Sequence, residues 1–104
     1  MGRELVSGPA VLLSIVMPVH NEARTLETAV RRLDGAGLPN PWELVVVDDG
    51  STDGATDALT HAWVPTAERV VLVRSRENRG KGSALRKGFE LARGDVLGVQ
   101  DADL

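Results

Sequence analysis

Four short runs of apolar residues recur along the chain, and they constrain its fold more than any other feature. They span residues 12–17, 44–47, 70–73 and 96–100, and each contains β-branched valine or isoleucine. Nearly every position in these runs is apolar, as is typical of strands that are covered on both faces. The chain is therefore predicted to build a sheet that lies between two layers of helix.

The segments between the runs carry helical patterns. Asn21 and Ser51 are predicted N-caps of the first and second helices, Gly35 and Gly37 are expected to end the first, and Gly94 is expected to follow the third as its C′ residue. The predicted inward-facing residues of the three helices are Leu26, Ala29, Val30 and Leu33, then Ala55, Ala58, Leu59 and Ala62, and finally Leu85, Phe89 and Ala92.

This β-α-β-α-β-α-β order predicts an α/β fold: a Rossmann-like half of a doubly wound parallel sheet, with about four strands in the order 3-2-1-4 and helices on both faces. In that order the chain changes direction between the first and fourth strands, and ligands bind in the crevice at their carboxyl ends. Residues 1–11 are predicted to be a leader and residues 12–104 one domain. The fourth strand is expected to be an apolar edge.

Composition excludes several classes of function. The net charge of −3 at pH 7, with basic residues scattered among acids, argues against a nucleic-acid partner held by a broad basic face. The absence of cysteine excludes thiolate catalysis and zinc–thiolate sites, and it fits a cytoplasmic location. The apolar stretch 11–19 is far shorter than the roughly 20 residues that span a bilayer, so no transmembrane segment is predicted.

Acidic residues follow the fourth apolar run directly. Asp101 and Asp103 are one residue apart, and alternate side chains of an extended segment leave the same face. The two carboxylates could share one hard divalent cation, Mg²⁺ or Mn²⁺, which in turn could hold a diphosphate. The alternative is that both are ordinary turn residues.

Polar residues also follow the first two runs. Of Asp48 and Asp49, one is expected to serve the turn, while the other could accept a hydrogen bond from a nucleobase N–H. Glu22 is either a first-turn acid stabilised by the helix dipole or a ligand contact. His20 lies in the same loop and has several structural explanations.

The loop 78–83 contains glycines and the cations Arg79 and Lys81 ahead of the third helix. It matches neither G-x-x-x-x-G-K-[ST] nor the G-x-G-x-x-G motif, which would have to follow the first strand. A dinucleotide-binding Rossmann domain is therefore disfavoured. Lys81 and its neighbours could instead meet an anion at the helix N-terminus, or they could be solvated cations on a flexible loop.

Together, the segments 18–22, 46–53, 78–84 and 94–104 resemble the family 2 GT-A glycosyltransferases, and within them the dolichyl-phosphate and polyprenyl-phosphate mannose or glucose synthases. The likeness extends from Leu12 to the end. It implies a nucleotide-sugar site whose base and ribose pocket is formed by Pro18, His20, Glu22, Val47 and Asp49, and whose metal and diphosphate are handled by Asp101, Ala102 and Asp103, the DXD motif. His20 stands where many members carry tyrosine.

The resemblance implies an inverting transfer of a hexose from a GDP- or UDP-sugar, with a polyprenyl or dolichyl phosphate as the acceptor, at the cytoplasmic face of a membrane. The chain would be the N-terminal part of such an enzyme, ending just after the DXD motif, and no catalytic residue is assigned within it. Two alternatives stay open. One is a nucleotide-binding fragment without turnover, and the other is a nucleotidyltransferase, although the expected glycine-rich loop after the first strand is missing.

Overall fold

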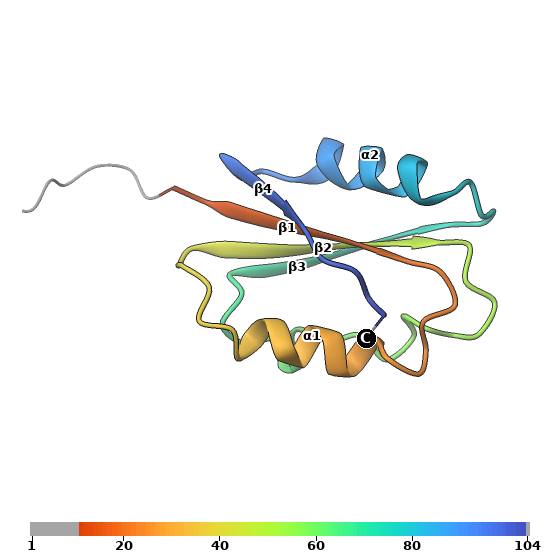
Figure 1. The fold of residues 1–104 in the computed structure, drawn as a ribbon, viewed down its shortest axis with the longest axis horizontal. Coiled ribbons are helices and arrows are strands. Elements are labelled where there is room, and N and C mark those ends of the chain that lie inside the picture. Colours follow the sequence, from red (N-terminus) through yellow and green to blue (C-terminus); the bar gives the residue numbers. More distant parts are fainter. Residues whose placement is uncertain (1–10, 104) are drawn as a thin grey trace, which may run out of the picture.

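The computed structural model describes residues 11–103, which form a parallel sheet flanked by helices. The strands are β1 (Leu13–Val19), β2 (Trp42–Asp49), β3 (Arg69–Ser75) and β4 (Val96–Val99). Their order is β3-β2-β1-β4 (Figure 1), and each neighbouring pair is parallel. The predicted order 3-2-1-4 is confirmed. The predicted leader lies outside the described residues, apart from Val11.

Each face of the sheet is covered by one α-helix. α1 (Leu26–Asp34) lies on one face and α2 (Lys81–Leu91) on the other, as Figure 1 shows, and the 3₁₀-helix η1 (His61–Trp63) contacts α1. Side chains of β1 and β2 alternate between two buried clusters, so that Met17 and Val46 lie with α1 whereas Val16 and Val47 lie with α2. Helices on both faces are therefore confirmed. No helix in residues 11–103 is long and apolar enough to cross a bilayer.

α1 buries the four residues predicted for it, Leu26, Ala29, Val30 and Leu33, and Gly35 caps its C-terminus. Its start differs from the prediction, because Thr25 is the N-cap and Asn21 lies before it with φ of +53°. Asn is one of the few residues that adopt this left-handed conformation readily. Asn21 therefore turns the chain at the end of β1 instead of capping the helix.

The predicted second helix is wrong. The segment after β2 forms turns and only the short η1, because Gly50 and Gly54 have φ near +70°. Asp53, which lies in this segment, accepts the Ala55 amide with one carboxylate oxygen and the Ala23 amide with the other. These local side-chain bonds compete with the backbone bonds of a helix.

α2 packs on the sheet through its smallest residues. Ala84 and Gly88 are its buried positions, and a Cβ on Gly88 would lie 2.3 Å from a Val16 methyl carbon. Phe89, predicted to face inward, is 39% exposed because it projects from the side of this narrow contact. Gly94 is not a left-handed C′ residue either. Its missing Cβ makes room for the Ser14 hydroxyl, which would otherwise be 2.3 Å away.

β4 lies at the edge of the sheet, as predicted, and pairs with β1 from Leu13 to Val16. Its apolar residues Val96, Leu97 and Val99 are 51%, 48% and 48% exposed. The sheet is thus well covered over β1 and β2 and open along β4.

At the amino ends of the strands, Glu43 is the centre of a buried polar network. Its carboxylate accepts hydrogen bonds from the Ser14 hydroxyl (2.6 Å), the Arg93 amide (2.7 Å) and Arg69 Nε (2.7 Å). Ser14 in turn accepts the Gly94 amide at 2.8 Å. Burial by itself would raise the pKa of Glu43, but these hydrogen bonds outweigh it and hold the pKa below its usual value of 4.5. The network fastens β1, β3 and the end of α2 to β2.

Glu43→Gln should lower the free energy of unfolding by about 2–3 kcal/mol at pH 7, because the neutral amide cannot replace the charge-assisted bonds. A folded-state pKa below 4.5 means that the ionised carboxylate stabilises the fold above that pH and ceases to do so as pH falls through the folded pKa. Urea unfolding at pH 7 and at about pH 3.5 should therefore show that the difference in unfolding free energy between the wild type and Glu43→Gln is smaller at the lower pH. Glu27→Gln, at an exposed pair with Arg31, should cost less than about 0.5 kcal/mol. An equal loss for Glu43→Gln at both pH values would contradict the role of charge.

Gly88→Ala should destabilise the chain by about 1–3 kcal/mol, since the added methyl group would collide with Val16 under α2. Gly82→Ala on the same helix is the matched control. A Cβ there meets nothing within 4 Å, so the change should be neutral or stabilising by up to about 1 kcal/mol. Thermal unfolding of the two variants tests this, and equal melting temperatures would contradict the packing account.

Candidate functional site

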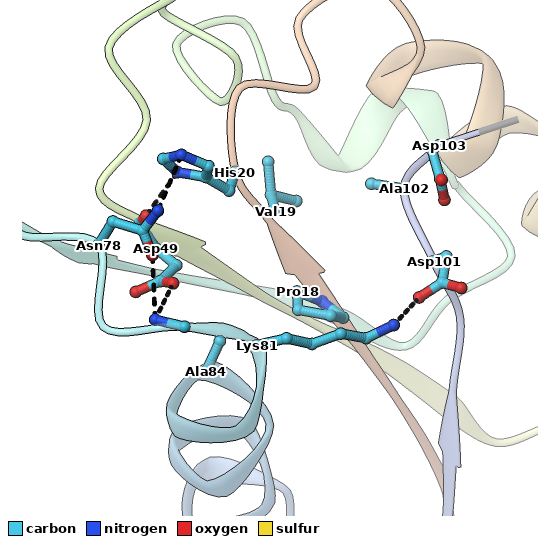
Figure 2. A pocket seen from close by; sticks show the side chains of 11 residues that line it. Pro18, Val19, His20, Asp49, Asn78, Lys81, Ala84, Asp101, Ala102 and Asp103 are labelled. Atoms are coloured by element: carbon cyan, nitrogen blue, oxygen red, sulfur yellow. Dashed lines mark hydrogen bonds and ion pairs between the residues drawn. The ribbon is translucent and has the colours of Figure 1, made fainter.

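A pocket of about 260 Å³ opens where the carboxyl ends of β1, β2 and β4 meet the start of α2 (Figure 2). Segments far apart in the sequence thus gather at one edge of the sheet, as the predicted topology requires. The residues that line the pocket are Pro18, Val19, His20, Asp49, Asn78, Gly80, Lys81, Ala84, Asp101, Ala102 and Asp103.

The loops after β1 and β2 are held together by Asn21. Its backbone N–H donates to the Ser51 hydroxyl at 2.9 Å, and its side-chain oxygen accepts the Thr52 amide at 2.7 Å. Ser51, predicted to cap a helix, is therefore a partner of the β1 loop. This cross-link fixes where His20 lies relative to Asp49.

The paired aspartates at the end of β2 have different surroundings, and one of them serves the turn as predicted. Asp48 is buried and accepts the Ser51 amide (2.9 Å) and the Thr56 hydroxyl (2.5 Å). Burial would raise its pKa, but these hydrogen bonds prevail and lower it. Asp48 is thus the aspartate that serves the turn.

Asp49 faces the pocket and organises the loop that precedes α2. Its two carboxylate oxygens accept the amides of Arg79 (2.9 Å) and Gly80 (2.8 Å). Gly50 allows this close approach, since a Cβ there would lie 2.5 Å from the Asn78 nitrogen. Each carboxylate oxygen has two lone pairs, so Asp49 can accept a further donor from a ligand.

His20 bridges the same two segments. Its Nδ1 lies 2.8 Å from the Asp49 carbonyl oxygen, and its Nε2 lies 2.9 Å from Asn78 Nδ2 (Figure 2). The carbonyl can only accept and the amide NH₂ can only donate, so the partners assign the neutral tautomer with the proton on Nδ1. Asn78 is itself oriented because its Oδ1 accepts the Gly80 amide at 3.0 Å. The ring is held in place from both sides.

The acidic end of the pocket is formed by residues 101–103. Ala102 is 2% exposed, and its carbonyl accepts the Thr25 hydroxyl at 2.8 Å, while Asp101 and Asp103 on either side are exposed and line the pocket. The exposed and buried side chains alternate as expected, but the chain bends at Ala102 and is not a continued strand. Lys81 Nζ lies 2.7 Å from Asp101 Oδ1, and the hydrogen bond and charge of Asp101, with Asp103 adding to them, raise the pKa of Lys81.

Among the described residues, the carboxylates at this end of the pocket are those of Asp101 and Asp103. Across residues 11–103 no group of three or more His, Asp or Glu side chains is placed to hold a metal ion. Asp101 and Asp103 are hard oxygen donors, and their exposure leaves room for further ligands. They therefore fit a divalent cation that takes its remaining ligands from a phosphate and water, as Mg²⁺ and Mn²⁺ commonly do.

Most of the predicted site residues line the pocket, but two do not. Val47 is buried under α2, and the Glu22 carbonyl accepts the Thr25 and Leu26 amides at the start of α1. Ligand contacts for all of these residues stay predictions. Val19, Asn78, Gly80 and Ala84 line the pocket without having been predicted as site residues. The position of Asn78 and Gly80 in the glycine-containing loop was the signal that could have included them.

Comparison with known proteins places these residues in context. The family model described as Glycosyl transferase family 2 matches residues 14–104. An undecaprenyl-phosphate 4-deoxy-4-formamido-L-arabinose transferase of Pseudomonas syringae pv. syringae is 41% identical over 98 residues, which are 92% of this chain and 29% of that protein. The chain thus spans less than a third of the length of this relative.

Solved structures that share the fold at more than 30% identity include two that were solved with Mn²⁺. The mannosyltransferase PcManGT of Pyrobaculum calidifontis, solved with GDP-Man and Mn²⁺, matches with a TM-score of 0.72 and 32% identity over 88% of this chain and 27% of its own. Glucosyl-3-phosphoglycerate synthase of Mycobacterium tuberculosis, solved with Mn²⁺, UDP and glucosyl-3-phosphoglycerate, matches with a TM-score of 0.62 and 31% identity over 90% and 34% of the two chains. Both neighbours were solved with a nucleotide and a divalent metal.

Asp49→Asn should free the loop that precedes α2, because the Arg79 and Gly80 amides bond to different oxygens of Asp49, and the NH₂ group of asparagine would face one of these two donors. We expect a loss of about 1.5–3 kcal/mol in stability, with faster hydrogen exchange at the Arg79 and Gly80 amides by NMR. Asp57→Asn is the control, since Asp57 is exposed and pairs only at the surface with Arg74. Unchanged exchange at the two amides in Asp49→Asn would show that the loop does not depend on this carboxylate.

Proposed function

This chain belongs to glycosyl transferase family 2, and we propose that its pocket binds the donor of a glycosyl transfer, a GDP- or UDP-sugar, together with Mg²⁺ or Mn²⁺. The observation that carries the proposal is the pair of exposed carboxylates, Asp101 and Asp103, across the pocket from Asp49 and His20 (Figure 2). One end of the pocket suits a cation with its diphosphate, and the other suits a nucleobase.

In this proposal the base and ribose lie against Pro18, His20 and Asp49, which line the pocket, whereas Glu22 and Val47 do not line it and stay predicted contacts. The Asp49 carboxylate accepts a base N–H with a lone pair that the loop amides leave free. The fixed His20 ring offers a flat surface beside it. Asn78 and Gly80 keep these groups in position through the bonds described above.

The diphosphate would lie between the start of α2 and residues 101–103. The helix N-terminus and Lys81 both favour an anion there. Asp101 and Asp103 would hold the cation, which when bound neutralises the diphosphate as it leaves. Relatives and neighbours support this assignment, because two of them were solved with Mn²⁺ and a nucleotide or nucleotide sugar.

For the complete protein we propose an inverting transfer of a hexose to a polyprenyl phosphate at the cytoplasmic face of a membrane. The polyprenyl-phosphate acceptor is supported by the similarity to an undecaprenyl-phosphate 4-deoxy-4-formamido-L-arabinose transferase, whose named sugar is a pentose. The hexose is supported by the structural neighbour that was solved with GDP-Man. A phosphate acceptor is already anionic near neutral pH, so its attack on the anomeric carbon needs no protein base. This agrees with a pocket in which His20 is engaged on both ring nitrogens. The family match disfavours a nucleotidyltransferase.

Calorimetric titration of GDP and UDP, with and without MnCl₂, tests the proposal. One of the nucleotides should bind the wild-type chain more tightly with Mn²⁺, and Asp103→Ala should remove most of that gain, by about tenfold in Kd or about 1.4 kcal/mol. Asp57→Ala removes an exposed carboxylate outside the pocket and should bind as the wild type does. Nucleotide binding that is independent of Mn²⁺ and unchanged in Asp103→Ala would exclude the metal assignment.

A further inference from the structure

The ion pair between Lys81 and Asp101 occupies one of the two carboxylates that the proposed function gives to the metal. Lys81 begins α2, and its side chain stretches past Pro18 to place Nζ 2.7 Å from Asp101 Oδ1 (Figure 2). No other Lys or Arg is among the residues that line the pocket. Without a ligand, the charge at this end is therefore balanced by Lys81.

A divalent cation and the Lys81 ammonium group compete for the same place. Lys81 contacts one oxygen of the Asp101 carboxylate, so a cation bound to this carboxylate would lie beside the ammonium group, and two positive groups held a few ångströms apart repel one another. A cation that arrives alone must displace Lys81, which then has no other anion in the pocket except Asp103 and the amide-bonded Asp49. A cation that arrives with a diphosphate brings a new anionic partner for the displaced ammonium.

We propose that the Lys81 ammonium group takes the place of the cation at Asp101 while no metal is bound, which we call its placeholder role. Lys81 is then a positioning residue that couples metal binding to diphosphate binding. The inference rests on the proposed function, because it assumes that Asp101 and Asp103 are metal ligands. It goes beyond that function by stating that Lys81 weakens binding of the metal alone and favours binding of metal and nucleotide together. The exchange is physically easy, since the Lys81 and Asp101 side chains are 60% and 54% exposed and such pairs are weak.

The neighbouring cations do not share this role. Arg79 lies 3.8 Å from Glu77 and donates only its backbone amide to Asp49. Lys87 is exposed on the same helix but is not among the residues that line the pocket. Lys87 therefore offers a matched control with the same charge, helix and side chain.

Lys81→Met keeps the aliphatic length and removes the charge. Binding of Mn²⁺ is measured from the EPR signal of the free ion, first with the metal alone and then with saturating GDP or UDP. The variant should bind Mn²⁺ alone more tightly, by roughly three- to tenfold. The factor by which nucleotide improves Mn²⁺ affinity should shrink. Lys87→Met should match the wild type in both titrations, and circular dichroism should show that both variants are folded.

The outcomes separate this inference from the proposed function. If Lys81→Met weakens nucleotide binding but leaves the affinity for Mn²⁺ alone unchanged or lower, Lys81 is only a phosphate contact and the placeholder role is wrong, while the proposed function stands. If the wild-type chain binds nucleotide with no help from Mn²⁺, both are wrong. If Lys81→Met and Lys87→Met gained equally in affinity for Mn²⁺ alone, the effect would come from the net charge of the chain, and the inference would also be overturned.

Discussion

Strand β2 holds both ends of helix α2 through two carboxylates, and the geometry of the pocket depends on this constraint. Glu43 at the start of β2 accepts the Arg93 amide after the helix, and Asp49 at the end of β2 accepts the Arg79 and Gly80 amides before it. Both carboxylates are nearly inaccessible to solvent, where charge-assisted bonds to backbone amides are strong. The helix therefore has a fixed position along the strand, and its first residue, Lys81, is delivered to the pocket.

Much of the fold followed from pattern alone. The four valine-rich runs predicted the parallel strands, and the usual strand order of doubly wound sheets predicted the order 3-2-1-4. The buried face of α1 was equally predictable, because its four apolar residues recur at helical spacing. The alanine spacing after Ser51 predicts a second helix, but Gly54 has a left-handed backbone that interrupts a helix there. The prediction that Phe89 faces inward was wrong. The helix packs on the sheet through Gly88 instead, which leaves Phe89 exposed, and the sequence pattern does not reveal this close contact.

The candidate site was predictable in outline because its residues follow directly after strands of known order. Which of Asp48 and Asp49 faces the pocket depended on hydrogen-bond partners in other loops, namely Thr56 for one and the Arg79 amide for the other. The role of Asn78 depended on His20, which lies 58 positions away in the sequence. Such pairings form only when the chain has folded, so local pattern could not rank these residues against each other.

The close approach at Gly88 has a consequence for the pocket itself. Because no side chain separates α2 from Val16, the helix axis lies low over the sheet. Lys81 is seven residues earlier, or about 10 Å along the axis. A bulkier residue at position 88 would tilt the helix and raise its amino terminus away from residues 101–103. The height of α2 above the pocket thus depends on Gly88, a residue two turns further along the helix that does not line the pocket.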